Sequence, residues 1–280
     1  MAAFARSAPR GWRRRGQFAE VERFCLFLGY PRSGHSLVGS LLNAHPEILV
    51  SHELDAVGYV EHHFRRAQLY TLILERDELF ASMGRTWTGY GYEVPGQFQG
   101  RWTRLRVIGD KRGRDTSFRL GRGGVRLLER VRRVVGVPIS VVHVTRDPFD
   151  NIATMSRYRH RPRRAGAPAG SPGRALEEAV DRYAELCRWV DEVRRRLAPE
   201  ELHDLAYEDF VARPEESLAG LCRFLGVEAS PSYLSACAGV VWPDVRPTRE
   251  AVGWTGRNRE RVAELVATYP VLSRYGEAAR

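Results

Sequence analysis

Apolar residues in this chain form two kinds of pattern, short continuous runs and longer stretches with helical spacing. The continuous runs, bounded by glycine or charged residues, predict β-strands at Phe24–Leu28, Leu105–Ile108, Ile139–Val144 and Leu202–Ala206. The helical spacing predicts helices at Ser36–Asn43, Val57–Met83, Leu176–Val193 and Leu218–Leu225. Alternating strands and helices predict an α/β fold with three layers, a mostly parallel central sheet and helices on both faces.

Local signals mark where several of these elements begin and end. Asp147 is placed to cap a helix, with Pro148 at its first position and Asp150 in capping-box register. The segment Arg157–Gly173 is rich in Arg, Pro, Gly and Ala, which predicts a mobile loop. Residues 1–20 carry five arginines before Gln17 and no apolar stretch, which predicts a flexible basic tail, with a transit peptide as the alternative. The domain is then expected to span residues 21–280.

Composition and charge narrow the class of protein. The chain has 280 residues, 43% of them hydrophobic and 28% charged, and no run of 18 apolar residues, so we expect no membrane span. The net charge of +10, mostly from arginine, suggests an anionic ligand. Nucleic acid is not expected as a partner, because no basic stretch is interleaved with aromatics in a known pattern. Four cysteines lie in apolar patterns without C-x-x-C spacing, which predicts buried reduced thiols and a cytoplasmic protein.

The segment Gly29–Ser36 has the spacing of a P-loop, G-x-x-x-x-G-K-[S/T], except that His35 stands in place of the lysine. Backbone N–H groups of such a loop and the start of the following helix bind phosphate or sulfate. Arg32 can add a bidentate contact to the anion, and the Ser33 and Ser36 hydroxyls can donate to it. An ordinary strand-to-helix turn is the alternative.

A second charged site follows the clearest predicted strand, which runs into Thr145-Arg146-Asp147. A P-loop NTPase has an acidic residue at the end of a later strand, where it holds Mg²⁺. A cation here predicts a second anionic group and no metal. His62-His63 after Glu61 lacks the H-E-x-x-H spacing of a zinc site.

Together the two sites resemble the PAPS-dependent sulfotransferase family, whose donor is 3′-phosphoadenosine 5′-phosphosulfate (PAPS). Tyr30–Ser36 resembles the family's 5′-phosphosulfate loop, and Val141–Pro148 resembles its 3′-phosphate strand and turn. The resemblance implies that the loop residues Arg32, Ser33, Gly34, His35 and Ser36 bind the 5′ end of the donor. It also implies that Arg146 and Thr154, with Ser156 as a substitute, hold the 3′-phosphate.

Later segments are similar to the family as well. Leu205–Phe210 resembles a stretch in which a tyrosine, here Tyr207, lies near the adenine. Gly253–Asn258 resembles a late loop whose basic residue, here Arg257, returns to the 3′-phosphate. The arginine in the loop and the sequence Asn43–Glu47 are closest to the tyrosylprotein and carbohydrate branches.

Sulfuryl transfer needs positioned cations and a general base. Arg32 is predicted to stabilise the charge on the leaving phosphate. By resemblance to the tyrosylprotein branch Glu53 is the predicted base, with His52 as the rival and a helix cap or ion pair as the structural alternative. Lys111, after a predicted strand, either neutralises the transferring group or forms a surface pair with Asp110.

The sequence therefore predicts an enzyme that transfers a sulfuryl group from PAPS to a hydroxyl or amine. The acceptor class stays open among small molecules, carbohydrates and tyrosine, and the aromatic cluster Trp87–Trp102 is either an acceptor pocket or core. Two alternatives remain: an ATP-dependent small-molecule kinase with a degenerate P-loop, and a basic nucleic-acid-binding protein using Met1–Gln17 and Arg157–Arg164. The oligomeric state is not predicted.

Overall fold

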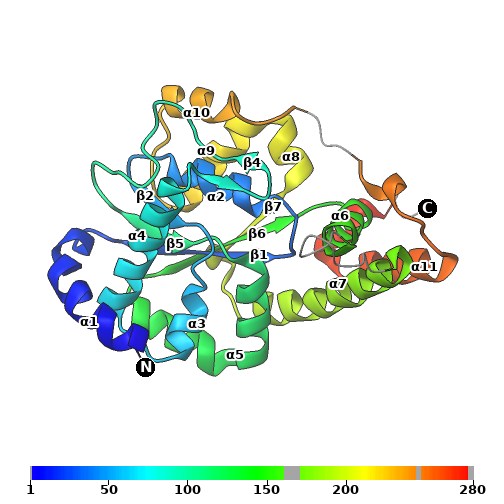
Figure 1. The fold of residues 1–280 in the computed structure, drawn as a ribbon, viewed down its shortest axis with the longest axis horizontal. Helices are drawn as coiled ribbons and strands as arrows, with labels where there is room; N and C mark the ends of the chain where they lie inside the picture. Colours follow the sequence, from blue (N-terminus) through cyan, green and yellow to red (C-terminus); the bar gives the residue numbers. More distant parts are fainter. Residues whose placement is uncertain (1, 161–170, 244–246, 277–280) are drawn as a thin grey trace.

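A computed structural model describes residues 2–160, 171–243 and 247–276. Within these residues a five-stranded sheet with the order β2-β5-β1-β6-β7 lies at the centre, and helices cover both of its faces (Figure 1). Every neighbouring pair of strands is parallel. In sheet order the strands are β2 (Ile48–Ser51), β5 (Val107–Asp110), β1 (Arg23–Gly29), β6 (Ile139–Thr145) and β7 (Leu202–Ala206). The predicted fold class is confirmed.

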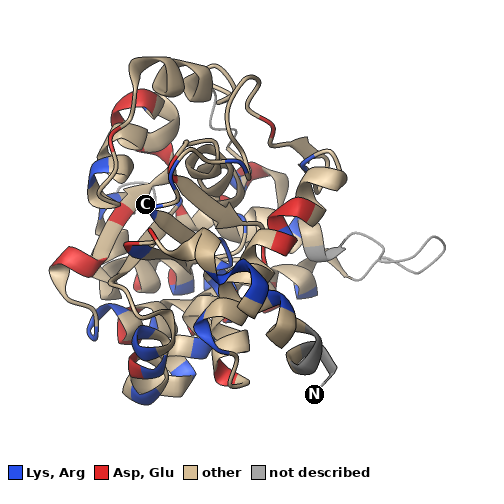
Figure 2. Ribbon diagram, turned by 90° about the vertical axis from the view of Figure 1, so that its left-hand side faces the viewer, with Lys and Arg blue, Asp and Glu red and all other residues tan. Residues whose placement is uncertain are grey.

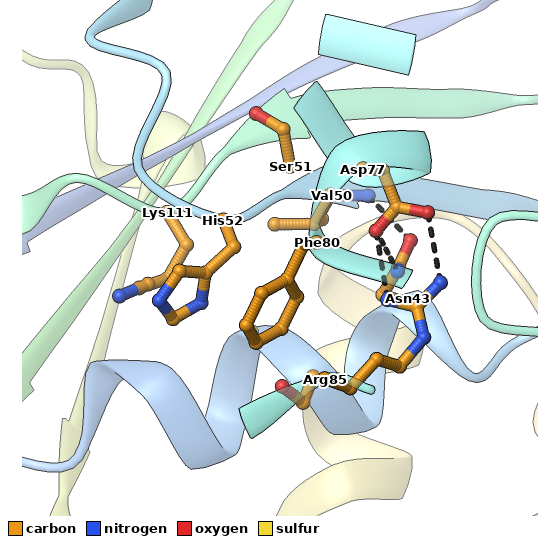
Figure 3. A pocket seen from close by; sticks show the side chains of 10 residues that line it. Asn43, Val50, Ser51, His52, Asp77, Phe80, Arg85 and Lys111 are labelled. Carbon is orange, nitrogen blue, oxygen red and sulfur yellow. Dashed lines mark hydrogen bonds and ion pairs between the residues drawn. The ribbon is translucent and has the colours of Figure 1, made fainter. Parts of the chain in front are cut away.

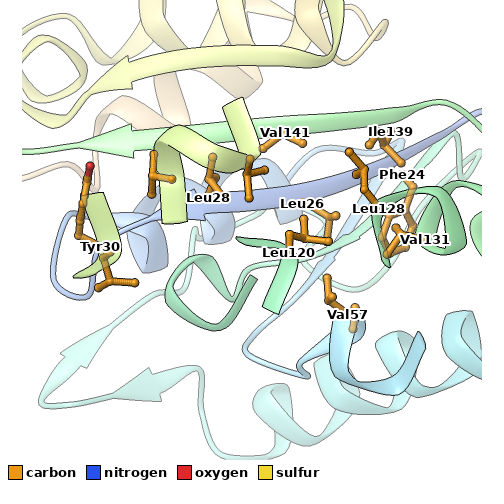
Figure 4. Packing of buried hydrophobic residues seen from close by; sticks show 14 of the residues in the cluster. Phe24, Leu26, Leu28, Tyr30, Val57, Leu120, Leu128, Val131, Ile139 and Val141 are labelled. Atoms are coloured by element: carbon orange, nitrogen blue, oxygen red, sulfur yellow. The ribbon is translucent and has the colours of Figure 1, made fainter. Parts of the chain in front are cut away.

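The two faces of the sheet pack against separate hydrophobic cores. On β1, Phe24, Leu26 and Leu28 belong to one core, whereas Cys25 and Phe27 belong to the other. This alternation follows from the period of two residues in a strand. Figure 4 shows the first set facing the long helix α5 (Gly113–Val135). Since both faces are covered, the central strands are apolar without interruption.

The first core is covered by helices from both halves of the chain: α3 (Ala56–Glu61), α4 (Arg66–Ser82), α5, α6 (Pro148–His160), α7 (Pro172–Arg194) and α11 (Gly256–Thr268). The second core lies under a smaller group: α2 (His35–Asn43), α8 (Tyr207–Ala212), α9 (Pro214–Phe224) and α10 (Pro231–Ala238). All the strands of the parallel sheet end at the same edge, so the loop after β1 lies between the ends of β5 and β6.

The predicted flexible tail is wrong for the described residues. Ala2–Arg14 form a helix, α1, and a 3₁₀ turn follows at Arg15–Phe18. Helix α1 packs against α4, and Phe4 meets Phe64, which lies just before α4, edge to face with ring centroids 5.2 Å apart. Gly11 allows this close approach, because a Cβ at this position would lie 2.9 Å from the backbone nitrogen of Gln68. Among the α1 residues whose side chains are described, the buried ones are the small residues Ser7 and Gly11. The sequence therefore has no apolar pattern that would predict this helix.

Several element boundaries also differ from the prediction. Strand β5 begins at Val107 rather than Leu105, and neither β2 nor α5 was predicted. Helix α5 is rich in Arg and Gly, and its backbone departs from helical geometry at Gly124, with φ of 63°. Helix α6 continues to His160, so the predicted loop 157–173 begins later, and residues 161–170 of it lie outside the described residues.

Acidic and basic residues are interleaved on the surface helices (Figure 2). Arg119, for example, pairs with Asp55 and Glu61. The four cysteines are buried and free, as predicted. Among the described residues, no helix is both long enough and apolar enough to cross a membrane.

Candidate active site

The loop Gly29–Ser36 connects β1 to α2 and has an unusual backbone. Gly29, Arg32 and Gly34 have φ values of 133°, 69° and 101°. Gly34 lies directly under the ring of Tyr207, since a Cβ there would be 2.3 Å from Tyr207 Cδ2. Only glycine combines this φ with this contact. A loop of this kind, followed by the first turn of α2, offers backbone N–H groups that favour an anion.

Residues that follow β6 hold this loop in place. The Asn151 side chain donates to the carbonyl of Pro31 at 2.6 Å, and Arg146 Nη1 donates to the carbonyl of Arg32 at 3.4 Å. Asn151 was not predicted from the sequence, although it lies next to the capping motif that identified Arg146. The two predicted anion sites are therefore in direct contact.

Two of the predicted ligand side chains point into the protein. His35 Nε2 donates to the carbonyl of Leu28 at 3.0 Å, and Nδ1 lies 3.1 Å from Ser33 Oγ, which also donates to the carbonyl of Tyr30. Burial lowers the pKa of His35 to about 3, so the ring is neutral. These side chains therefore hold the conformation of the loop through contacts inside the protein.

Ser36, Lys111 and Glu53 form a connected group beside the loop. Lys111 Nζ donates to Ser36 Oγ at 2.8 Å and to Glu53 Oε1 at 2.9 Å. The Lys111 side chain is only 4% exposed, whereas that of Glu53 is 33% exposed. Asp110 is fully buried as well. The alternative of a surface pair between Asp110 and Lys111 is therefore wrong, because the turn after β2 covers both residues.

The charges within this group shift both pKa values. Burial acts to raise the pKa of Glu53, but the charge and hydrogen bond of Lys111, together with His52 and Arg112, outweigh it, and the pKa of Glu53 is lowered. Burial also lowers the pKa of Lys111, against the opposing effect of the Glu53 carboxylate. At neutral pH Glu53 is thus ionised and able to accept a proton.

His52, the rival base, is enclosed. Its ring stacks on Phe80 with centroids 4.1 Å apart and meets Trp87 edge to face at 5.3 Å. Burial, followed by the charge of Lys111, lowers the pKa of His52 to about 3. Figure 3 shows His52 between Lys111 and Phe80 at a small cavity of about 10 Å³, which has room for no more than a water molecule. Glu53 is the more accessible of the two predicted bases.

Arg32 contacts a hairpin that was not predicted, formed by β3 (Thr86–Trp87) and β4 (Tyr90–Gly91). Its Nη1 donates to Thr88 Oγ1 at 3.3 Å, and its guanidinium lies 3.8 Å from the centre of the Tyr158 ring. No sequence motif marks these two partners. A buried ion pair anchors the hairpin, with Arg85 Nη1 2.9 Å from Asp77 Oδ1 (Figure 3).

The remaining residues predicted to bind the nucleotide are Arg146, Tyr207, Thr154 and Arg257. The Arg146 guanidinium is 5.7 Å from the centre of the Tyr207 ring, which brings both beside the loop. Thr154 Oγ1 donates to the carbonyl of Asp150 at 2.8 Å and contacts Thr248 Oγ1 at 3.0 Å. Arg257 is exposed in the first turn of α11. The predicted roles of Thr154 and Arg257 stay predictions.

Comparison with known proteins gives a family match for part of the chain. Residues 139–231 match the sequence profile described as the sulfotransferase family, and this segment includes both Arg146 and Tyr207. This part of the chain is thus similar to the sulfotransferase family. The comparison does not assign the chain to a branch, and among curated proteins none matches it.

Solved sulfotransferase structures share the fold of this chain. Mouse SULT7A1 complexed with PAP superposes with a TM-score of 0.52 at 14% identity, over 92% of this chain and 88% of that one. Sulfotransferase STF1 from Mycobacterium tuberculosis H37Rv gives 0.53 at 13% identity, over 92% and 81%. The sulfotransferase domain of the curacin biosynthetic pathway gives 0.52 at 16% identity, over 89% and 96%. At these identities the likeness concerns the fold.

Proposed function

We propose that this protein is a sulfotransferase, which takes its sulfuryl group from PAPS and transfers it to a hydroxyl or amine of an acceptor. The observation that carries the proposal is the contact between two cationic sites at adjacent strand ends. The loop with Arg32 follows β1, Arg146 directly follows β6, and Arg146 Nη1 lies 3.4 Å from the Arg32 carbonyl. A nucleotide with anionic groups at both its 5′ and 3′ ends matches this pair of sites.

The ring of Tyr207 completes the proposed nucleotide site. It lies over Gly34 and near Arg146, so a base bound between the two anion sites would meet an aromatic surface. The chemistry of the donor set also fits, because arginine side chains and helix N–H groups recognise phosphate and sulfate without a metal. PAPS would supply an activated sulfuryl group and leave as PAP.

The catalytic roles follow from the charges of the chain's own residues. The Arg32 guanidinium stays ionised and is the proposed stabiliser of the charge on the leaving phosphate. Lys111, next to the Ser36 hydroxyl, is proposed to neutralise the transferring group. Glu53 is the proposed general base, which takes the proton from the acceptor hydroxyl onto a carboxylate oxygen. His52 is proposed to support Glu53 by packing.

The acceptor is proposed to bind in front of Glu53, against the β3–β4 hairpin. Trp87 and Tyr92 from this hairpin pack near His52, and Tyr90 is exposed. Aromatic side chains suit a phenol, a sugar or a tyrosine side chain. Transfer of radiolabelled sulfate from PAPS to one acceptor of each class tests this part. The buried thiols support a cytoplasmic location.

A thermal-shift measurement tests the donor. A ligand at 100 times its dissociation constant stabilises a protein by about 2.7 kcal/mol, which for a protein of this size raises Tm by roughly 5–10 °C. We expect PAP to give such a shift in wild type and a much smaller one in Arg146→Ala. ATP with Mg²⁺ is the comparison. A shift with ATP and Mg²⁺ and none with PAP would favour the kinase alternative.

A further inference from the structure

The turn that carries the proposed base is closed around one buried carboxylate. Asp110 lies at the end of β5 and is fully buried. Its Oδ1 accepts from Ser51 Oγ and from the backbone N–H of Leu54, both at 2.9 Å. Its Oδ2 accepts from the backbone N–H groups of Asp55 and Ala56, both at 2.8 Å. The four donors lie on either side of His52 and Glu53.

These contacts hold the turn in a strained conformation. Glu53 and Asp55 have φ values of 58° and 75°, in the left-handed region that non-glycine residues seldom adopt. Each such residue costs on the order of 1–3 kcal/mol unless its surroundings compensate. Three consecutive N–H groups that donate to one carboxylate provide this compensation, because charge-assisted hydrogen bonds are stronger than neutral ones. Without the carboxylate, the turn has no reason to keep this geometry.

The neighbouring residue in the chain fixes the Glu53 side chain. Lys111 Nζ donates to Glu53 Oε1, so Asp110 sets the backbone of the base while Lys111 sets its carboxylate. Arg112 Nη1 adds a contact to the Glu53 carbonyl at 3.1 Å. The segment Asp110–Arg112, at the end of β5, therefore fixes both the backbone and the side chain of Glu53.

We propose that Asp110 is a positioning residue for the proposed base: its buried carboxylate folds the 51–56 turn so that Glu53 faces Lys111 and Ser36. The inference rests on the proposed function for its effect on rate, but the placement of Glu53 can be measured without turnover. It also explains why an aspartate is buried at the carboxyl end of a strand where an apolar residue would cost less.

The first experiment is a carbon-13 NMR titration of the glutamate side chains, with Glu53→Gln to assign the Glu53 signal. In wild type we expect Glu53 to titrate below its ordinary pKa because it faces Lys111. In Asp110→Asn only one side-chain oxygen remains to accept, so the donors at either Oδ1 or Oδ2 lose their partner, and we expect the pKa of Glu53 to return toward about 4.3. An unchanged pKa of Glu53 in Asp110→Asn would overturn the proposal, whatever the enzyme's activity.

A matched control separates positioning from general stability. Asp204 on the edge strand β7 is another carboxylate that accepts hydrogen bonds, in this case from His143 and Arg194. It has no contact with the 51–56 turn among these bonds. Asp204→Asn is expected to lower Tm while leaving the titration of Glu53 as in wild type. If Asp110→Asn does not fold, Ser51→Ala removes a single donor and is expected to shift the Glu53 pKa in the same direction by less. No shift in Ser51→Ala would then count against the proposal.

The second experiment is a double-mutant cycle on kcat. A misplacement of about 1 Å costs on the order of 100-fold in rate, so we expect Asp110→Asn to lower kcat roughly 10- to 100-fold and to leave PAP affinity nearly unchanged. In the Glu53→Gln background the same substitution should have little further effect, because both act through one group. Equal losses in both backgrounds would contradict positioning. Absence of any transfer by wild type would instead contradict the proposed function.

Discussion

The Arg32 guanidinium lies 3.8 Å above the ring of Tyr158, while its Nη1 donates to Thr88. Arg32 comes from the loop after β1, Tyr158 from α6 and Thr88 from the hairpin. Arg32, the proposed stabiliser of the leaving group, is thus held by α6 and the hairpin, which both lie outside the nucleotide loop. Cation–π contacts of this kind restrict a long side chain and keep its charge.

Tyr158 is therefore expected to matter through its ring and not through its hydroxyl. Exposed cation–π contacts contribute about 0.5–1 kcal/mol, so Tyr158→Leu should lower kcat roughly two- to fivefold. Tyr158→Phe keeps the ring and should retain the wild-type rate. Steady-state kinetics on the two variants measures this difference in kcat. Equal rates for Tyr158→Leu and Tyr158→Phe would show that the contact between Arg32 and the Tyr158 ring has no role in turnover.

Arg32 and Arg146 should separate into a rate effect and a binding effect. Removing a preorganised donor from a developing charge costs about 10²–10³-fold in kcat, which we expect for Arg32→Ala. Arg146→Ala should mainly raise the dissociation constant of PAP, because its site is anionic in both donor and product. Isothermal titration calorimetry measures the dissociation constant of PAP, and steady-state kinetics measures kcat. Near-normal turnover by Arg32→Ala would refute the proposed role of Arg32.

The pH dependence of kcat should identify the base. A carboxylate base works only when ionised, so activity falls as pH drops through the lowered pKa of Glu53, below its ordinary value. The acid limb of the profile should thus lie below about pH 4.3. Folding stability has the same sign: the Glu53–Lys111 contribution is present above the pKa of unfolded glutamate and is lost as pH falls through the folded value.

Two substitutions check this assignment directly. Glu53→Gln should lower kcat by about 10²–10⁴-fold at every pH. His52→Phe keeps the stack on Phe80 and should retain most of the activity. If His52→Phe were inactive and Glu53→Gln active, the two roles would have to be exchanged.

The strand end and the helix start at this site could be predicted from the sequence because their signals are local. Gly29 ends an apolar strand, and Pro148 and Asp150 mark a helix start, so the two proposed anion sites could be located in the chain. The burial of Lys111 could not be predicted in this way. It depends on the turn after β2, and β2 is a four-residue strand without turn signals of its own.

The other missed features have a similar cause. Helix α5 was not predicted because arginines and glycines break its apolar pattern, although it covers the central strand. The contact between Arg32 and Tyr158 joins distant parts of the chain, and neither residue type implies the other. The inward orientation of His35 follows from the close approach of Gly113, where a Cβ would lie 2.6 Å from the imidazole ring.

Gly34→Ala gives the sharpest test of the nucleotide loop. The new methyl group would lie 2.3 Å from the Tyr207 ring, at a φ of 101° that alanine seldom adopts. The backbone strain alone costs on the order of 1–3 kcal/mol. The clash would also displace either the loop or Tyr207, so we expect the PAP-induced thermal shift to disappear. Gly84→Ala is the control, since its φ is also positive, at 67°, and nothing lies within 4 Å of its Cβ.

Gly84→Ala should therefore lose a little stability and keep the full shift with PAP. The double substitution Gly34→Ala with Tyr207→Ala removes the clash and leaves only the backbone strain. If the clash is what blocks binding, the double variant should bind PAP better than Gly34→Ala alone, although it lacks the aromatic surface. If instead Gly34→Ala bound PAP as wild type does, the loop would not be the nucleotide site, because the contact between Gly34 and Tyr207 cannot survive an added Cβ.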